Sequence, residues 1–177
     1  MQVADTTPPR VTIAGGVTLV TLEAGSTFTP PTVTASDTVD GAITTITRTP
    51  ASIDTRRVGD VTVTFSARDA AGNVGSASLT LRIVDTTPPV LFLNGPASVD
   101  QRIDTPYVDS GAYATDNADS TATLQPRITA TSTVVVSREG DYTVTYNVQD
   151  LSGNTAASIA RNVHVSVRDS VVGLTTC

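Results

Sequence analysis

Two copies of one pattern, VGDVTVTFSARDAAGN (Val58–Asn73) and EGDYTVTYNVQDLSGN (Glu139–Asn154), decide the fold. After Gly-Asp, apolar and polar residues alternate over eight positions, and this period of two predicts a strand with one buried face. The Asp-x-x-Gly-Asn that follows predicts a tight turn, because Gly accepts positive φ and Asp can close the turn with its side chain. The positions expected to be buried are Val61, Val63, Phe65 and Ala67 in the first copy and Tyr142, Val144, Tyr146 and Val148 in the second.

A second alternating run follows each turn and predicts the returning strand of a hairpin. Strict alternation would also point the charged Arg161 inward, so we expect a bulge between Ile159 and Val163 that turns this side chain away. The residues expected to face the core are Ala77, Leu79, Leu81 and Ile83 in the first copy and Val163, Val165 and Val167 in the second.

The duplication extends outward from the hairpins. The pentapeptide DTTPP occurs at Asp5–Pro9 and at Asp85–Pro89, and SDTVDG (Ser36–Gly41) matches TDNADS (Thr115–Ser120). A nearly constant spacing of 79 to 81 residues between matching segments indicates two homologous units. Paired prolines keep the chain extended and cannot donate backbone hydrogen bonds. DTTPP is therefore predicted to be the joint between units and the entrance to the first strand of each.

Shorter β-rich runs fill the rest of each unit. They are RVTI, VTLVTLE, TVTAS and AITTITR in the first unit and VLFL, YVDSGAYA, TLQPRIT and TVVVS in the second. About seven short strands at regular spacing, found twice, predict an all-β fold of two tandem β-sandwiches. The domains are expected at residues 1–84 and 85–169, with residues 170–177 a C-terminal tail or the start of a further domain.

The repeated motifs resemble a known family. In the second unit, D-T-T-P-P is followed by G-A-x-A-x-D-x-x-D, by the hairpin pattern above and by a closing R-x-V-x-V that begins at Arg161. This series resembles the tandem immunoglobulin-like (Ig-like) repeats of microbial and extracellular surface proteins, which are similar to hyalin-type (HYR) repeats and also occur alongside insecticidal crystal toxins. The resemblance implies that the fold is two tandem Ig-like β-sandwiches. The first unit departs from the series at Val61, where the pattern has Tyr. The resemblance implies a secreted or cell-surface spacer or adhesion module.

Composition excludes several classes of function. A net charge of −6 and a pI near 4.5 argue against a nucleic-acid partner. No apolar run reaches the roughly 18 residues of a membrane-spanning helix, so no membrane insertion is expected. Cys177 is the one cysteine, so no disulfide within the chain is expected. Because Met1 leads directly into the first repeat, we expect a monomeric fragment of a longer protein.

Catalytic signals are absent from the sequence. His164, the one histidine, shares the polar side of a strand with Asn162 and Ser166 and is expected to be an ordinary surface residue. The sequence has no nucleophile elbow, phosphate-binding loop or zinc-ligand spacing. We therefore predict that the protein is not an enzyme and has no catalytic residues.

Aspartates in turns give the sharpest chemical signal. In an Ig-like sandwich, the start of the first strand and two of the loops gather at one end. Carboxylates together with an amide oxygen form the ligand set that Ca²⁺ prefers. The alternatives are that each Asp closes its own turn, or that Arg56 and Arg57 compensate the charge at the junction. The residues predicted to gather are Asp85, Asp116, Asp119, Asp150 and Asn154 at the junction, and Asp5, Asp37, Asp40, Asp69 and Asn73 in the first unit.

The predicted function is that of an extracellular structural or adhesion spacer, which holds other domains away from a cell surface. Its expected partners are neighbouring Ig-like or other domains of the parent protein and cell-surface glycans or proteins, with Ca²⁺ as the one cofactor considered. The alternatives are a glycan-binding module that uses its apical loops, or an accessory domain of a toxin or secreted hydrolase. Glycan binders commonly expose aromatic rings, whereas most Tyr and Phe here are expected in the core, with Tyr107 and Tyr113 left open.

Overall fold

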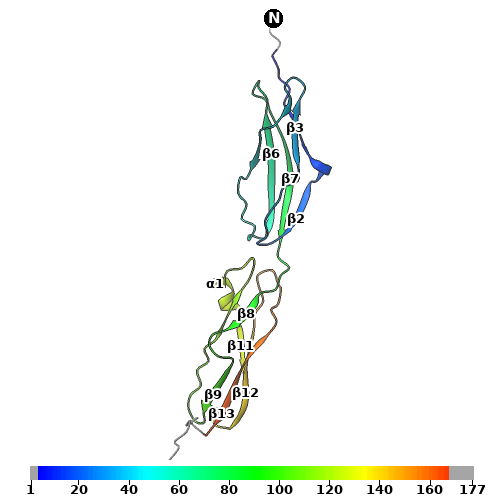
Figure 1. The fold of residues 1–177 in the computed structure, drawn as a ribbon. Helices are drawn as coiled ribbons and strands as arrows, with labels where there is room; N and C mark the ends of the chain where they lie inside the picture. The colour runs from blue at the N-terminus through cyan, green and yellow to red at the C-terminus, as the bar shows by residue number, and fades with distance from the viewer. Residues whose placement is uncertain (1–3, 168–177) are drawn as a thin grey trace, which may run out of the picture. The chain divides into compact units, whose positions relative to one another are not determined.

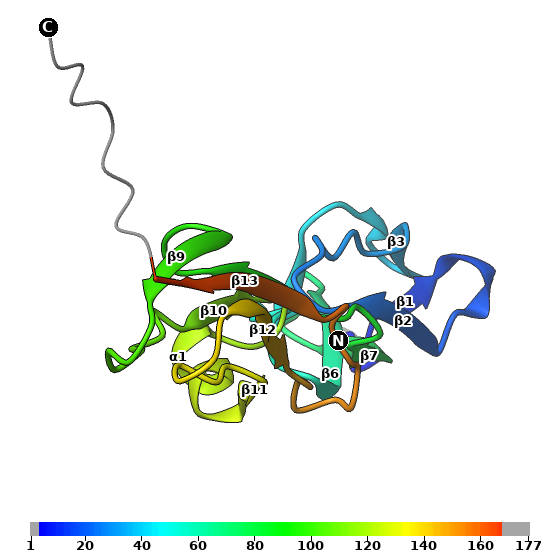
Figure 2. The ribbon, with the colours of Figure 1, turned by 90° about the horizontal axis from the view of Figure 1, so that it is seen from below.

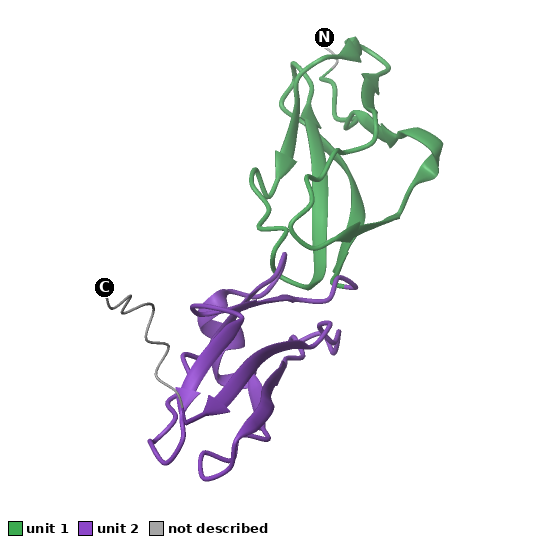
Figure 3. Cartoon of the chain, turned by 60° about the horizontal axis from the view of Figure 1, so that its bottom comes forward, with its two compact units in different colours: residues 1–85 green, residues 86–177 purple. Residues whose placement is uncertain are grey.

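The computed structural model describes residues 4–167, so the predicted tail at 170–177 and Cys177 lie outside the described residues. The chain divides into two compact units, Met1–Asp85 and Thr86–Cys177 (Figure 3). Each unit is an Ig-like β-sandwich, so the predicted fold class is confirmed. The few helices among the described residues are single turns, and none has the length of a membrane-spanning helix.

The first unit packs a three-stranded sheet against a four-stranded one (Figure 1). The smaller sheet has the order β1 (Arg10–Ile13), β3 (Val33–Asp37) and β4 (Gly41–Ile43). The larger has the order β2 (Leu19–Glu23), β7 (Val74–Val84), β6 (Gly59–Arg68) and β5 (Ile46–Thr49), and the 3-10 turn η1 (Ala14–Gly16) joins β1 to β2. All neighbouring strands are antiparallel except β2 and β7, which are parallel.

The second unit repeats this plan with a two-stranded and a four-stranded sheet. The smaller sheet pairs β8 (Val90–Leu93) with β10 (Ala112–Thr115). The larger has the order β11 (Thr129–Ser132), β12 (Gly140–Asn147), β13 (Ile159–Ser166) and β9 (Ser98–Arg102), with β9 parallel to β13. A helical turn, α1 (Thr121–Leu124) with η2 (Gln125–Arg127), lies beside β10 (Figure 2).

The two hairpins have the predicted register. In β12 and just beyond it, Val144, Tyr146 and Val148 are buried, while Tyr142 is half-buried. In β6 the same holds for Val63, Phe65 and Ala67, with Val61 half-buried. The returning strands bury Leu79, Leu81, Ile83, Val163 and Val165. One predicted position is wrong, because Val167 follows the end of β13 and is 62% exposed.

The predicted bulge at Arg161 is also wrong. The pairing of β12 with β13 runs without interruption through Val144–Arg161, and the Arg161 side chain is fully buried. The register shifts by one residue earlier, between the bridge Gln149–Thr155 and the pair Tyr146–Ile159. This irregularity beside the hairpin loop accounts for the extra residue of the second repeat, and it leaves β13 regular with its arginine facing inward.

Arg161 is tolerated in the core because a network of acceptors surrounds it. Its guanidinium forms an ion pair with Asp109 and donates hydrogen bonds to the backbone carbonyls of Asn94 and Pro96. The Tyr146 hydroxyl also donates to Asp109. Burial is the main cause that raises the pKa of Tyr146 to about 12, and the hydrogen bond to Asp109 is the second. A buried charge of this kind is stable only when it is paired and hydrogen-bonded.

The first unit has an apolar core at the matching positions. Because Val144 and Val63 are equivalent in the aligned hairpins, their partners Arg161 and Leu79 are also equivalent. Leu79 is buried, and Phe65 stands where the second unit has Tyr146. At this position of the shared fold, the second repeat therefore uses an ion pair, whereas the first uses hydrophobic packing.

Two of the shorter strand predictions for the second unit are wrong, and one strand was missed. The run TLQPRIT forms α1 and η2 instead of a strand, because the Ser120 hydroxyl caps the helix by accepting a hydrogen bond from the Thr123 amide at 3.2 Å. The run TVVVS lies in the turn that follows β11. The strand β9 was not predicted, since its sequence SVDQR is mostly polar.

Candidate functional site

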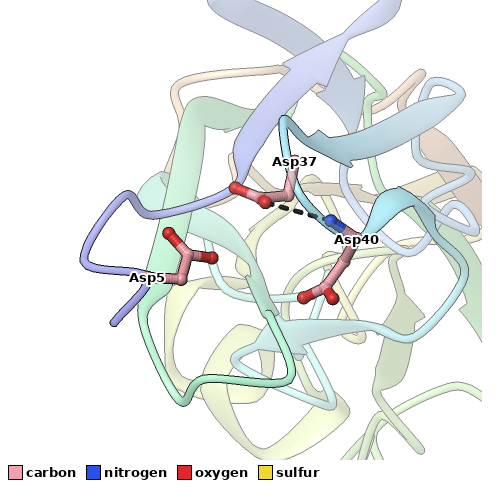
Figure 4. A group of neighbouring side chains, drawn as sticks. All are labelled: Asp5, Asp37 and Asp40. Atoms are coloured by element: carbon pink, nitrogen blue, oxygen red, sulfur yellow. Dashed lines mark hydrogen bonds between the residues drawn. The ribbon is translucent and has the colours of Figure 1, made fainter. Parts of the chain in front are cut away.

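At one end of the first unit, three aspartates come together from separate segments. Asp5 belongs to the DTTPP segment before β1, Asp37 is the last residue of β3, and Asp40 lies in the turn before β4. Each offers a carboxylate oxygen, and these oxygens all lie within 4.8 Å of one another (Figure 4). The sequence placed these residues at a common end of the sandwich, and the structure shows that they form one group.

One oxygen of each carboxylate fixes the local backbone. The Asp37 Oδ1 atom accepts hydrogen bonds from the amides of Val39 at 2.8 Å and Asp40 at 3.3 Å. The Asp5 Oδ1 atom accepts from the Thr7 amide at 3.0 Å. The Asp40 Oδ2 atom accepts from the amide of Ala70, in the β6–β7 turn, at 2.8 Å. Asp5 and Asp37 therefore close their own turns, whereas Asp40 links its turn to the β6–β7 turn.

The second oxygens of Asp5 and Asp37 have a different environment. Both Oδ2 atoms are buried and have no hydrogen-bond partner among the described residues, and the whole Asp37 residue is only 9% exposed. Two unit charges 4 Å apart repel by about 1 kcal/mol in water and by about 4 kcal/mol at the effective dielectric typical near protein surfaces. The site therefore concentrates negative charge around oxygens that the protein itself leaves unsatisfied.

Asp69 and Asn73 serve as a bracket beside this group. The two oxygens of Asp69 accept from the backbone amide of Asn73 at 2.7 Å and from its side-chain nitrogen at 2.8 Å. Burial alone would raise the pKa of Asp69, but these hydrogen bonds outweigh it and lower the pKa below 3.8. The Asn73 side chain also donates to the Asp5 carbonyl at 3.2 Å. The Asn73 side-chain nitrogen thus links the DTTPP segment to the hairpin by donating hydrogen bonds to both.

The contacts of Asp37, Asp40 and Asp69 recur at the equivalent residues of the second unit. The Asp116 Oδ1 atom accepts from the amides of Ala118 at 2.8 Å and Asp119 at 2.9 Å, and Asp119 accepts from the Leu151 amide at 2.8 Å. The two oxygens of Asp150 accept from the backbone and side-chain nitrogens of Asn154, at 2.7 Å and 2.9 Å. Carboxylate oxygens of Asp85, Asp116 and Asp150 lie within 4.8 Å of one another.

His164 lies on the exposed face of β13, as predicted. Its Nδ1 atom is 2.7 Å from the Asp141 Oδ1 atom, and both side chains are largely exposed. The hydrogen bond to Asp141 raises the pKa of His164 above 6.5.

Sequence reasoning missed an exposed aromatic pair. Phe92 on β8 and Tyr113 on β10 are cross-strand partners, and their rings stack with centroids 5.1 Å apart. They are 42% and 38% exposed, whereas most aromatic residues were expected in the core. Tyr107, the other position left open, is half-buried and donates a hydrogen bond to Asp109. The alternating VLFL run was the available signal, because it puts Phe92 on the face opposite to the buried Leu91.

Comparison with known proteins identifies the family. The model of the family described as "Bacterial surface protein, Ig-like domain" matches the chain twice, at residues 11–83 and 91–165. The chain belongs to this family. The resemblance drawn from the repeated motifs is thereby confirmed, and the protein is an extracellular, cell-surface Ig-like module.

Two curated relatives are similar over nearly the whole chain. Hyalin from Lytechinus variegatus is 36% identical over 172 residues, which cover 90% of this chain and 31% of that protein. Hyalin from Strongylocentrotus purpuratus is 30% identical over 187 aligned residues, which cover 99% of this chain and 15% of that protein. The chain thus spans less than a third of the length of either relative.

Solved structures are more distant in sequence. The fibronectin(III)-like modules of Clostridium thermocellum CbhA are 14% identical, with 89% of this chain and 94% of that chain covered and a TM-score of 0.37.

Proposed function

We propose that this tandem pair is a non-catalytic spacer of a secreted or cell-surface protein, which holds neighbouring domains away from the surface. The observation that carries the proposal is the tandem match to a surface Ig-like family, in which only residues 84–90 lie between the two matched ranges. That interval contains the prolines of the second DTTPP. A short connection with paired prolines restricts the backbone between the units and suits a stalk.

The proposed partners are further domains of the same protein and molecules at the cell surface. The small share of each hyalin that the chain covers supports the presence of such neighbouring domains. The proposal of a non-catalytic role is supported by the position of the one histidine, His164, which lies on an open strand face and pairs with Asp141 at 2.7 Å.

Small-angle X-ray scattering of the full chain tests the spacer. We expect the profile of an elongated monomer, because the joint at Pro88–Pro89 is short and restricted. Replacing Pro88 and Pro89 by Gly should broaden the distribution of distances between the units. The matched control replaces Pro8 and Pro9, which have the same sequence context but do not lie between the units, and should leave the profile unchanged. A compact profile for the parent chain would contradict the spacer.

Glycan binding is a second candidate function, and the exposed pair Phe92–Tyr113 favours it. Aromatic faces on a surface suit the apolar faces of sugar rings, since they bury apolar area without leaving polar groups unpaired. The equivalent positions of the first unit, Thr12 and Thr34, are a cross-strand pair without aromatic rings. The candidate glycan-binding site therefore lies on the face formed by β8 and β10 and not on the apical loops.

Titration of the full chain with soluble cellohexaose, chitohexaose and mannohexaose tests this second function. A glycan-binding face predicts that one of these sugars shifts the ring resonances of Tyr113 in NMR spectra, while the amides of Thr12 and Thr34 stay fixed as an internal reference. Tyr113→Ala and Phe92→Ala should each abolish binding. Unchanged spectra at millimolar sugar would remove the glycan function and leave the spacer unaffected.

A further inference from the structure

We propose that the apex of the first unit binds one Ca²⁺ ion through Asp5, Asp37 and Asp40. The ion would be held by the carboxylate oxygens that the turns do not use. This inference does not depend on the spacer function, because it follows from the local geometry of one unit.

The buried second oxygen of Asp37 is the observation that points to a ligand. Asp37 is nine-tenths buried, its Oδ1 atom is occupied by two backbone amides, and its Oδ2 atom has no partner among the described residues. Figure 4 shows this carboxylate on the side facing Asp5, whose Oδ2 atom is likewise buried without a partner. Two anionic oxygens in such a position are unfavourable unless a cation compensates their charge.

The donor set favours calcium over other metals. All three side chains offer hard oxygen ligands, and the group has no histidine or cysteine of the kind that zinc prefers. The carboxylates come from a loop, a strand end and a turn, and Ca²⁺ accepts such irregular geometry with about six to eight oxygens. Mg²⁺ demands a near-ideal octahedron and releases its water reluctantly. Water and backbone carbonyls would complete the calcium shell.

The position of the ligands gives the ion a structural consequence. Asp5 belongs to DTTPP, whereas Asp40 accepts from the Ala70 amide in the β6–β7 turn. An ion bound by these side chains would hold the DTTPP segment against the turn that contains Asp40 and, through Asp40, against the β6–β7 turn. The local design recurs in the second unit, where the Asp116 Oδ1 atom closes the same kind of turn and the Oδ2 atom is again buried without a partner.

Isothermal titration calorimetry of the full chain with CaCl₂ tests the site. The titration is run on Asp116→Asn, so that the matching carboxylate of the second unit does not contribute. We expect one ion per chain, with a dissociation constant of about 0.1–1 mM, as in other extracellular calcium modules. We also expect about 5 mM Ca²⁺ to raise the melting temperature of the first unit by about 5–10 °C.

Asp37→Asn in the same background is the decisive variant. Asn keeps the Oδ1 acceptor for the two turn amides and removes only the charge and the free oxygen, so the fold is retained while the heat of binding is lost. Asp54→Asn is the matched control, because Asp54 also closes a turn, toward the Arg56 amide at 3.1 Å, but lies outside the group. This control should bind Ca²⁺ like the parent.

Three outcomes would overturn the proposal. No heat with CaCl₂ at about 10 mM, well above the affinities of extracellular modules, would show that the aspartates only close turns. Unchanged binding by Asp37→Asn would place the ion elsewhere. Equal binding of Mg²⁺ would overturn the assignment to calcium.

Discussion

Tyr146→Ala is expected to unfold the second unit near room temperature and to leave the first unit folded. The Tyr146 side chain is 2% exposed and belongs to the hydrophobic core of its unit. Truncation of a buried aromatic ring costs about 3–5 kcal/mol. A domain of this size has about 4–13 kcal/mol of stability in total. The loss of the hydrogen bond from Tyr146 to Asp109 adds to the cost, and thermal unfolding followed by circular dichroism would measure it.

Two further variants serve as comparisons. Tyr142→Ala removes the same kind of ring from the same face of β12. Because Tyr142 is only half-buried, this substitution should lower the melting temperature much less than Tyr146→Ala. Tyr146→Phe keeps the ring, as Phe65 does in the first unit, and removes the donor to Asp109. It should cost about 1–3 kcal/mol, the usual cost of a buried acceptor losing a partner. A Tyr146→Ala protein that melts like the parent would mean that the register of β12 is wrong.

Strand registers were predictable where burial alone decides them. The faces of β6 and β12 follow from alternation, because one face of each strand lies against a core and the other meets water. Alternation also points Arg161 inward, where the structure has it; the prediction that failed was the bulge, because a charge at an inward position was expected to force one. What keeps Arg161 inside is a set of partners far away in sequence, Asp109 and the carbonyl of Pro96 among them, and no local pattern records such contacts.

The candidate site was predictable in part of its membership but not in the roles of its residues. The family topology brings the loops to one end, and Asp5, Asp37 and Asp40 of the predicted set have carboxylate oxygens within 4.8 Å of one another there, while their binding of a metal stays a prediction. The sequence does not show that Asn73 uses its nitrogen to hold Asp69, or that the second oxygen of Asp37 is left buried without a partner. These differences depend on which atom of each side chain faces which amide, and that is decided by backbone geometry in the turns.

Asp109→Ala is expected to destabilise the second unit by about 3 kcal/mol. Removing one partner of a buried ion pair costs about 3–5 kcal/mol, because the remaining charge is left without compensation. The lower end of this range applies here, since the Asp109 side chain is 23% exposed while that of Arg161 is 1% exposed. Chemical denaturation of the second unit would measure the change. A loss near zero would mean that backbone carbonyls alone compensate Arg161.

The pH dependence of stability provides an independent measurement of the same pair. Burial would raise the pKa of Asp109, but hydrogen bonds from Tyr146, Tyr107, the Gly111 amide and Arg161 outweigh it, so that the pKa is lowered below 3.8. A carboxyl with a lowered pKa in the folded state stabilises the fold above its unfolded pKa, and this stability is lost as the pH falls through the folded value. Asp109→Ala should therefore flatten the loss of stability of the second unit below pH 3.8.

The double variant Asp109→Ala with Arg161→Leu decides whether the pair acts as a unit. The double variant removes both charges and introduces at position 161 the leucine that the first unit has at Leu79. Its loss of stability should therefore be smaller, by about 1–3 kcal/mol, than the sum of the losses of the two single variants. The exposed pair Asp60–Arg82, at 3.0 Å and about half exposed on both sides, is the matched control and should show additive effects, because solvent screens it. Additive effects at Asp109 and Arg161 as well would mean that the core tolerates the arginine through its carbonyl contacts. Coupling confined to the buried pair would instead show that one repeat holds its core by charge where the other holds it by packing.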